Sequence, residues 1–420
     1  MTVKKLFILA GAFIIANLMM SLDPVWAQVG FRSRLLPARF NETPSIPYNS
    51  ISANRSKRHH KNRSFLKEKS QYNVFYNRVD GILFNVQYKP SEYHKPGSGL
   101  LAKVMLGFGI ESKRIQYELS LERGFFGRQF RFAPGFEIYD KTFSEDRWII
   151  SRFENSLAAF LLHEDFMDYY RLQGYGGYIK QNIFGALSLK AGYYEDTELS
   201  LPRKTDWALF GGRKKFRENP PIQGGTFRGY KGQIVLDTRD SRRAPERGWY
   251  IQLLGEYFPA DLTSDFYYRR YIFDIRRYQP ISDGEILRLR MRLGDSRGDL
   301  PIQKWFDFGG ISTLRAYRHS SFRGTRMALL NFEYFLNWDE INWKPGFPLL
   351  DVFNLILFAD AGTAWDRSTK EFVDLTYRDF AADVGIALTN SNGRIRLNFA
   401  KRTDRSSNAV RITFRLRQPF

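Results

Sequence analysis

Three stretches decide the fold: Ile286–Leu293 is ILRLRMRL, Arg394–Phe399 is RIRLNF, and Val410–Arg417 is VRITFRLR. In each stretch apolar residues alternate with polar ones, which is the period of a β-strand with two unlike faces. The polar face carries eight arginines: Arg288, Arg290, Arg292, Arg394, Arg396, Arg411, Arg415 and Arg417. Alternation does not say which face points inward, because a soluble barrel buries its apolar face and a membrane barrel turns that face to lipid.

The same alternation continues outward from these stretches, from Arg78 to Phe420. It forms segments of about ten residues separated by turn residues, and we count about sixteen of them, an even number as in bacterial single-chain barrels. The first runs over Val79–Lys89, and another over Thr205–Gly212. The 37 Phe, 23 Tyr and 8 Trp favour the membrane arrangement. We therefore expect an all-β, transmembrane antiparallel β-barrel over 71–420, with a soluble exported barrel or sandwich as the alternative.

The N-terminus has the features of an export signal. The apolar run Leu6–Met20 is shorter than the ~20 residues of a spanning helix. Lys4 and Lys5 precede it, and Val25-Trp26-Ala27 follows with small residues at the two cleavage positions. We predict a cleaved signal peptide over 1–27, with a buried N-terminal helix as the alternative. The chain has no cysteine, so an exported form has no disulfide framework.

The net charge of +20 would ordinarily indicate a nucleic-acid partner. Predicted export to the outer membrane argues against that partner. Residues 28–70 hold ten Lys or Arg and two Asp or Glu among Ser, Asn and Pro. This composition predicts a disordered basic arm, which could bind anionic lipid headgroups or fill the lumen.

One interval departs from the β pattern. Ser151 and Glu154 fit a capping box, and Phe153, Leu157 and Phe160 then fall on one helical face. We expect a short amphipathic helix in this connection. Four predicted strands precede it, so with both termini in the periplasm the helix should lie at the periplasmic end, where it either caps the barrel mouth or binds a partner.

The sequence offers little for catalysis. His163, Glu164, Asp165 and Asp168 could supply metal ligands, but no second histidine cluster stands at ligand spacing. No G-x-S-x-G, Walker or dinucleotide motif occurs. We therefore predict no catalytic residue, no metal, no cofactor and no enzyme activity.

Three motifs in the second half carry a more specific signal. They are Asp237-Thr238-Arg239-Asp240 followed by Gly248, then Gly309–Tyr317 (GGISTLRAY), and then Phe358–Gly362 (FADAG). In this order and spacing they resemble the barrel of the BamA-like bacterial surface antigen superfamily. That resemblance implies assembly or transport of proteins at the outer membrane. It also implies client proteins or a separate periplasmic partner. A separate partner would be needed because residues 28–70 are too short and too polar to fold as one of the family's docking repeats.

The resemblance assigns roles to individual residues. In that family the loop between strands eleven and twelve bears a V-R-G-F/Y motif and folds into the lumen. Leu314, Arg315, Ala316 and Tyr317 match it here, and Glu333 and Asp360 match the acids of the inner wall. We expect Arg315 to pair with both acids and latch the loop. Ala316 replaces a glycine, so a requirement for positive φ there would force the loop to adjust.

The last strand resembles the signal by which outer-membrane proteins are recognised for insertion. Its apolar residues are in phase: Val410, Ile412, Phe414, Leu416 and Phe420.

Three functions remain open at this point. The leading hypothesis is a barrel that assists insertion or translocation of other proteins by opening between its first and last strands. The second is a gated or passive pore whose arginine-lined lumen prefers anions. The third is a structural barrel with no transport role.

Overall fold

The computed structural model describes residues 70–88, 99–126, 130–210, 212–341, 346, 353–391, 393–404, 409–416 and 420. The predicted signal peptide, all of the basic arm except Ser70, and Arg417 lie outside these residues. The chain divides into two units, and residues 69–371 and 378–420 form the larger one. The smaller unit contributes only 372–377 to the described residues. In the described ranges, no helix has the length and apolar character needed to cross a membrane.

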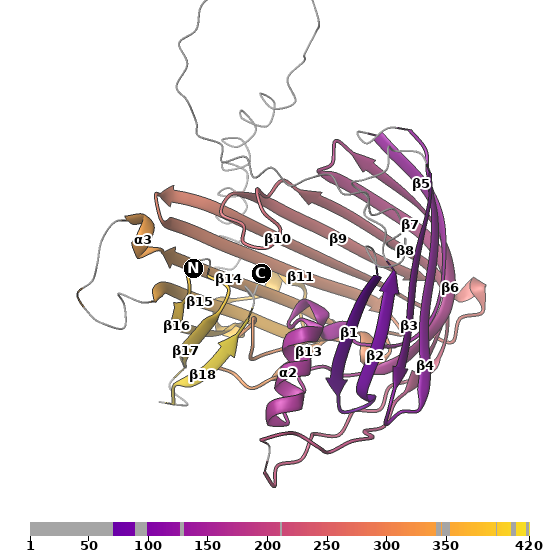
Figure 1. Cartoon of the computed structure of the whole chain (residues 1–420). Coiled ribbons are helices and arrows are strands. Elements are labelled where there is room, and N and C mark those ends of the chain that lie inside the picture. The colour runs from indigo at the N-terminus through magenta and orange to yellow at the C-terminus, as the bar shows by residue number, and fades with distance from the viewer. Residues whose placement is uncertain are drawn as a thin grey trace, which may run out of the picture. The chain divides into compact units, whose positions relative to one another are not determined.

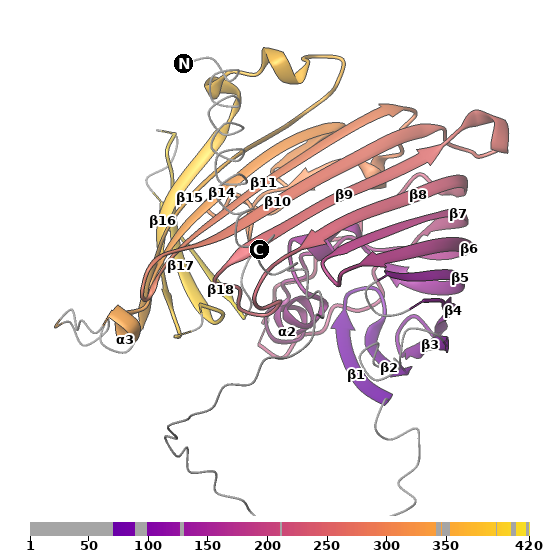
Figure 2. The same ribbon diagram turned by 90° about the horizontal axis from the view of Figure 1, so that it is seen from above.

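Sixteen strands of the larger unit form one antiparallel sheet in which each strand pairs with the next along the chain (Figures 1 and 2). They are β1 (Ser70–Asn77), β2 (Gly81–Tyr88), β3 (Gly99–Gly109), β4 (Arg114–Gly124), β5 (Phe130–Phe143), β6 (Tyr170–Ile183), β7 (Leu187–Ser200), β8 (Gly225–Asp237), β9 (Gly248–Phe258), β10 (Tyr268–Ser282), β11 (Glu285–Gly298), β14 (Arg326–Leu336), β15 (Asn354–Trp365), β16 (Ala381–Thr389), β17 (Arg396–Arg402) and β18 (Arg411–Arg415). A separate hairpin, β12 (Phe306–Phe308) and β13 (Phe322–Gly324), interrupts the β11–β14 connection.

The helices all lie in connections. The β5–β6 connection holds η1 (Glu145–Trp148) and α2 (Arg152–Leu162), and the others are η2 (Ala260–Leu262), η3 (Ile302–Lys304), α3 (Trp338–Ile341), η4 (Phe372–Asp374) and η5 (Tyr377–Asp379). Helix α2 begins as the capping box predicts, since Ser151 Oγ accepts from Glu154 N at 3.2 Å and donates to Glu154 Oε2 at 3.0 Å.

Burial settles which face of the sheet points inward. The Arg288 and Arg290 side chains are each 2% exposed, whereas Phe84 is 50% and Ile412 60% exposed. A surface with apolar side chains outward and charged side chains inward suits lipid and not water. The sheet is therefore a transmembrane antiparallel β-barrel, similar to the one that the alternation predicts.

The first and last strands of the sheet are not paired with each other among the described residues. Helix α2 lies between them instead, as both views show (Figures 1 and 2). We call the interval between β1 and β18 the seam. At the seam, side-chain contacts with α2 replace the hydrogen-bond ladder that closes a complete barrel.

The strand count differs from the expected one at two places. Strand β1 was not expected, and the described residues of Thr205–Gly212 form no strand. In that segment Leu209 N and Phe210 N donate to Phe160 O and Leu161 O at the end of α2, so its backbone is satisfied without a sheet.

This recount overturns the predicted place of the helix. The β5–β6 connection follows the fifth strand and not the fourth. In an antiparallel meander, connections after odd-numbered strands share one end of the sheet, so this connection leaves the sheet at the same end as the β11–β14 loop. If both termini face the periplasm, that end is the external one.

Candidate functional site: the lumen loop and the seam

The loop between β11 and β14 is compact and carries the Leu314–Tyr317 motif at its tip. Gly309 N donates to Thr313 Oγ1 at 3.0 Å, and Gly310 N donates to Leu314 O at 2.9 Å. The φ of Gly309 is 135° and that of Gly310 is 74°, values that favour glycine. This local folding forms the end of the β12–β13 hairpin, and Arg315 extends from it to side chains of β14 and β15.

Arg315 lies between the two carboxylates that the resemblance assigns to it. Its Nη2 is 2.7 Å from Glu333 Oε1, and its Nε is 3.2 Å from Asp360 Oδ2. The guanidinium also lies over the Phe358 ring, 4.1 Å from the centroid. Burial opposes the charge, but Asp360 and Glu333 hold the pKa of Arg315 above its ordinary value. The residue is 1% exposed, so these charge-assisted contacts are shielded from bulk water.

Further contacts join the loop to the wall of the barrel. Asn331 Nδ2 donates to Thr313 O and to Asp360 Oδ1, both at 2.8 Å. Ala316 N donates to Asp383 Oδ2 at 3.0 Å, and Tyr317 OH lies 3.3 Å from Asp404 Oδ2. The alternation of the strand predicts that Asp383 faces the lumen. It does not predict that Asp383 accepts a hydrogen bond from Ala316.

Ala316 needs no special backbone conformation. It is not among the described residues with positive φ. Its amide bond to Asp383 is available to any residue but proline, so the replacement of the family's glycine leaves the loop unstrained.

Two carboxylates engage four of the eight arginines of the predicted stripe. Glu333 also pairs with Arg396 at 2.7 Å and Arg288 at 3.6 Å. Asp274 pairs with Arg290 at 2.6 Å and Arg292 at 2.7 Å. Of the remaining predicted members, Arg394 and Arg411 are half-buried and Arg415 is buried.

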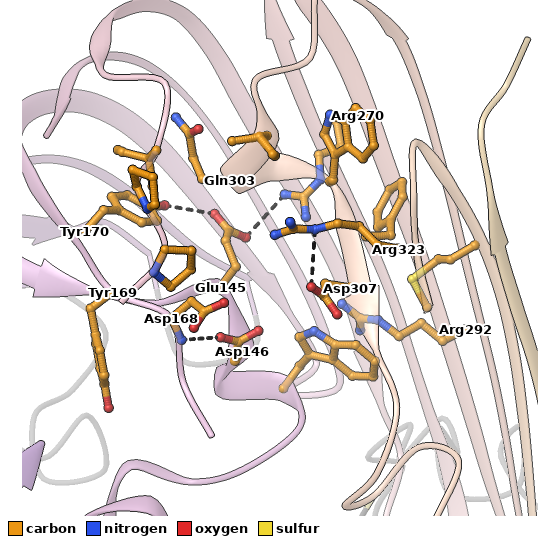
Figure 3. A pocket seen from close by; sticks show the side chains of 18 residues that line it. Glu145, Asp146, Asp168, Tyr169, Tyr170, Arg270, Arg292, Gln303, Asp307 and Arg323 are labelled. Carbon is orange, nitrogen blue, oxygen red and sulfur yellow. Dashed lines mark hydrogen bonds and ion pairs between the residues drawn. The ribbon is translucent and has the colours of Figure 1, made fainter. Parts of the chain in front are cut away.

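The segment η1 descends into the lumen beside this wall. Arg292 lies over the Trp148 ring, 4.2 Å from its centroid. Glu145 accepts from Tyr170 OH at 3.0 Å and from Lys304 Nζ at 2.8 Å, and Arg270 lies 3.3 Å away (Figure 3). Sequence reasoning missed this cluster, although the run Ser144-Glu145-Asp146 is a recognisable helix start.

The cavity of Figure 3, about 200 Å³, also holds two unusual acids. Burial raises the pKa of Asp146 to about 7, and the nearby Asp168 carboxylate adds to the effect. Burial also raises the pKa of Asp307 to about 6, although Arg323 Nε lies 3.3 Å from it. Both groups titrate close to neutral pH.

At the seam, Glu154 of α2 holds the last strand. Its Oε1 and Oε2 accept from Arg415 Nε and Nη2, both at 3.1 Å, and Oε1 also accepts from Leu416 N at 2.8 Å. Burial alone would raise the pKa of Glu154, but Arg415 holds it below its ordinary value. Both oxygens of the single Glu154 carboxylate therefore bind the end of the last strand.

The first strand is held two residues further along the helix. Ser156 Oγ accepts from Tyr76 N at 2.6 Å. The Tyr76 ring packs on Phe160 with centroids 5.7 Å apart, and Arg152 lies over the Phe75 ring at 4.4 Å. We call the contacts of Glu154 with β18 and of Ser156 with β1 the clasp. One helix thus joins both edges of the sheet.

The acidic stretch after α2 is occupied by hydrogen bonds and ion pairs. Arg78 Nη1 lies 3.2 Å from Asp165 Oδ1, and Arg78 Nη2 lies 2.9 Å from Asp168 Oδ1. His163 Nε2 contacts Asp206 O at 2.9 Å. Among the described residues, no group of three or more His, Asp or Glu is placed to hold a metal ion.

The Asp237–Gly248 motif forms the β8–β9 turn. Arg239 Nε and Nη2 donate to Asp237 at 2.8 and 2.9 Å, and Asp240 Oδ1 accepts from the amides of Ser241 and Glu246 at 2.8 and 3.1 Å. Gly248 has a φ of 111°, and a Cβ there would lie 2.4 Å from Thr238 O. The motif is therefore structural.

The proposed insertion signal divides in two. Ile412 and Phe414 are exposed on the outer face, and Leu416 is half-buried. Phe420 is buried and lines an arginine-rich cavity of the lumen.

The fold and its inward loop define a class, the bacterial barrel with a lumen-bound loop between its eleventh and twelfth strands. The model of the Omp85 superfamily domain matches residues 119–420, and the chain belongs to this superfamily.

Two relatives illustrate the likeness. The outer membrane protein assembly factor BamA of Nitratidesulfovibrio vulgaris is 26% identical over 165 residues, which cover 35% of this chain and 20% of that protein. The chain thus spans about a fifth of the length of this curated relative. The crystal structure of BamA from Haemophilus ducreyi lacking POTRA domains 1–3 matches with a TM-score of 0.51 at 14% identity, over 82% of this chain and 69% of that one. The second likeness concerns the fold alone.

Proposed function

We propose that this protein is an outer-membrane barrel that assists the insertion or translocation of other proteins and that it acts at the seam without enzyme activity. The main support is the clasp: β1 and β18 are joined through side chains of α2, while every other neighbouring pair of strands is joined by a ladder. An unpaired strand edge offers its amides and carbonyls to another strand. Release of the clasp would expose two such edges to a client protein within the membrane.

The lumen loop has a complementary role in this proposal. Arg315, held by Glu333 and Asp360, latches the loop against β14 and β15. The latch keeps the wall at β14 and β15 rigid, so that opening is confined to the seam. The resemblance to BamA supports the client class, outer-membrane proteins, and allows a separate periplasmic partner.

Depletion tests the proposal. Cells that lose the protein should lose a defined set of outer-membrane proteins from quantitative membrane proteomics, and re-expression of the wild type should restore them. Re-expression of a barrel with the seam covalently locked is the matched control and should not restore them. An unchanged membrane proteome after depletion would contradict the proposed function.

The anion-preferring pore is the second candidate, favoured by the excess of arginine in the lumen. Against it, Glu333 and Asp274 engage Arg288, Arg290, Arg292 and Arg396. These contacts weaken the bias of the lumen toward anions without cancelling the charge of the arginines. A purified barrel in planar bilayers that conducts steadily and selects anions would favour the pore over the assembly role.

A further inference from the structure

A second cavity, of about 450 Å³, lies in the lumen at the N-terminal end of α2. The end of η1, the start of α2, the β8–β9 turn and β10 line it, together with Arg394 and Arg415. The side chains of its lining include seven arginines and one carboxylate, Glu154, and Phe420, the last residue of the printed sequence, also lines it. The cavity of Figure 3 is the contrast, because four carboxylates face three arginines there. The charge excess is thus larger here than in the cavity of Figure 3.

The carboxylates behind these arginines are shared, so they do not cancel the excess. Asp237 serves both Arg239 and Arg242, at 2.8 and 3.6 Å. Asp274 serves Arg276 as well as two arginines of β11. Among the described residues, Arg147 and Arg243 form no ion pair within 4.0 Å.

Two further features favour an anion. Arg415 Nη1 is buried and has no hydrogen-bond partner among the described atoms. The cavity is also lined by Ile150 and Ser151, where α2 begins, so the positive end of an 11-residue helix faces it. Burial lowers the pKa of Arg147 to about 10, and the nearby Arg152 lowers it further, while Glu118 opposes both effects.

We propose that this cavity is a binding site for a small polyphosphate anion, a group with at least two phosphates. Guanidinium forks match phosphate oxygens in pairs, and several forks around one cavity favour a multiply charged ligand. The volume lies within the range of about 300–1,000 Å³ typical of small-ligand sites, and it is too small for a folded segment of another protein. The phosphates could belong to a free diphosphate or to a bisphosphorylated lipid headgroup. This site does not depend on the proposed function.

Pyrophosphate is the probe. The full chain in detergent micelles, titrated by calorimetry in a phosphate-free, low-salt buffer, should bind pyrophosphate saturably with one site per chain. The variant Arg147→Gln/Arg243→Gln should weaken binding by at least about tenfold, because it removes two charged hydrogen-bond donors from the cavity. These two side chains form no ion pair, so the variant should still fold as a barrel.

The matched control is Arg269→Gln/Arg297→Gln. These are exposed arginines that face each other on β10 and β11 and lie outside the cavity lining, and the control removes the same net charge. It should bind pyrophosphate within twofold of the wild type. Equal weakening in both variants, or no saturable binding by the wild type, would overturn the site. A tetraglutamate peptide that binds as tightly as pyrophosphate would overturn the choice of phosphate.

Nanodiscs distinguish the two sources. Addition of a bisphosphorylated lipid to zwitterionic nanodiscs should compete with pyrophosphate if lipid headgroups reach the cavity. If the source is a free diphosphate, pyrophosphate affinity should be the same in both kinds of nanodisc. The nanodisc results are interpreted only if the two double variants first bind pyrophosphate as predicted above.

Discussion

The wall around the lumen loop and the seam are held together in opposite ways. Strand β11 is 14 residues long, and its inward arginines are buried against carboxylates, of which Glu333 also holds the loop. Strand β18 has five residues and reaches α2 through one carboxylate. The wall combines a long ladder with a buried charge network, and the seam has neither. Under the proposed function, the seam is therefore the place where the barrel would open without losing its fold.

The largest expected effect comes from breaking the charge network of the wall. Glu333→Ala leaves Arg288, Arg315 and Arg396 buried around an empty position. Removal of one partner of a buried pair costs about 3–5 kcal/mol, and we expect a loss of that size in urea unfolding of the barrel in vesicles.

Glu371→Ala serves as the control for this network. Glu371 pairs with Arg326, but its side chain is 55% exposed, so water replaces the lost contact. We expect a much smaller loss than for Glu333→Ala, because an exposed ion pair contributes little to stability. Equal losses in the two variants would contradict the special role of the buried network.

The turn motif should come next. Gly248→Ala places a methyl group against Thr238 O at a φ of 111°. Strain of this kind costs about 1–3 kcal/mol, measurable in the same unfolding experiment. Gly255→Ala, in the same strand, has only the Tyr271 ring at 3.6 Å and should be tolerated. A stable Gly248→Ala barrel would show that the β8–β9 turn does not need its glycine.

These residues also show how much of the structure can be predicted from the sequence. Alternation and turn spacing predict sixteen strands, and the resemblance brings Arg315, Glu333 and Asp360 together before any coordinates. The sequence missed β1, because its eight residues adjoin a basic arm and have no turn signal before them. It also assigned a strand to Thr205–Gly212, whose backbone partners are at the end of α2.

The seam was beyond sequence reasoning for a different reason. Glu154 and Arg415 are 261 residues apart, and no local pattern joins a helix start to the last strand. The same holds for Lys304, which lies 2.8 Å from both Glu145 and Glu198. Contacts of this kind depend on how the β5–β6 connection enters the lumen. The predicted strand count placed this connection at the wrong end of the barrel.

A smaller effect, confined to the seam, is expected for Glu154→Gln. The amide keeps one acceptor oxygen but loses the charge that holds Arg415 and Leu416. We expect the free energy of unfolding to fall by about 1 kcal/mol. Hydrogen exchange should quicken at the amides of β18 and α2 and remain unchanged at β11. Glu164→Gln, in the same connection but exposed, should change neither. Faster exchange throughout the barrel would mean that the clasp and the wall are not separable.

A separate effect concerns pH. The folded pKa of Asp146 is about 7, above its ordinary value of 3.8, so folding favours the protonated form. The stabilisation that protonation provides is complete below about pH 3.8 and is lost as the pH rises through about 7. Asp146→Asn should remove this slope, so the variant gains stability relative to the wild type between pH 4 and 8. Parallel unfolding curves for the two proteins over this range would contradict the assignment.

A covalent lock of the clasp tests most directly whether the barrel acts at its seam. The chain has no cysteine, so Glu154→Cys/Arg415→Cys supplies the only two thiols for a short, reducible bis-maleimide. Leu289→Cys/Phe332→Cys, facing residues of β11 and β14, gives the matched lock in the wall. Assembly of outer-membrane proteins should stop with the seam locked, resume after reduction, and continue with the wall locked. Assembly that continues with the seam locked would contradict the proposal.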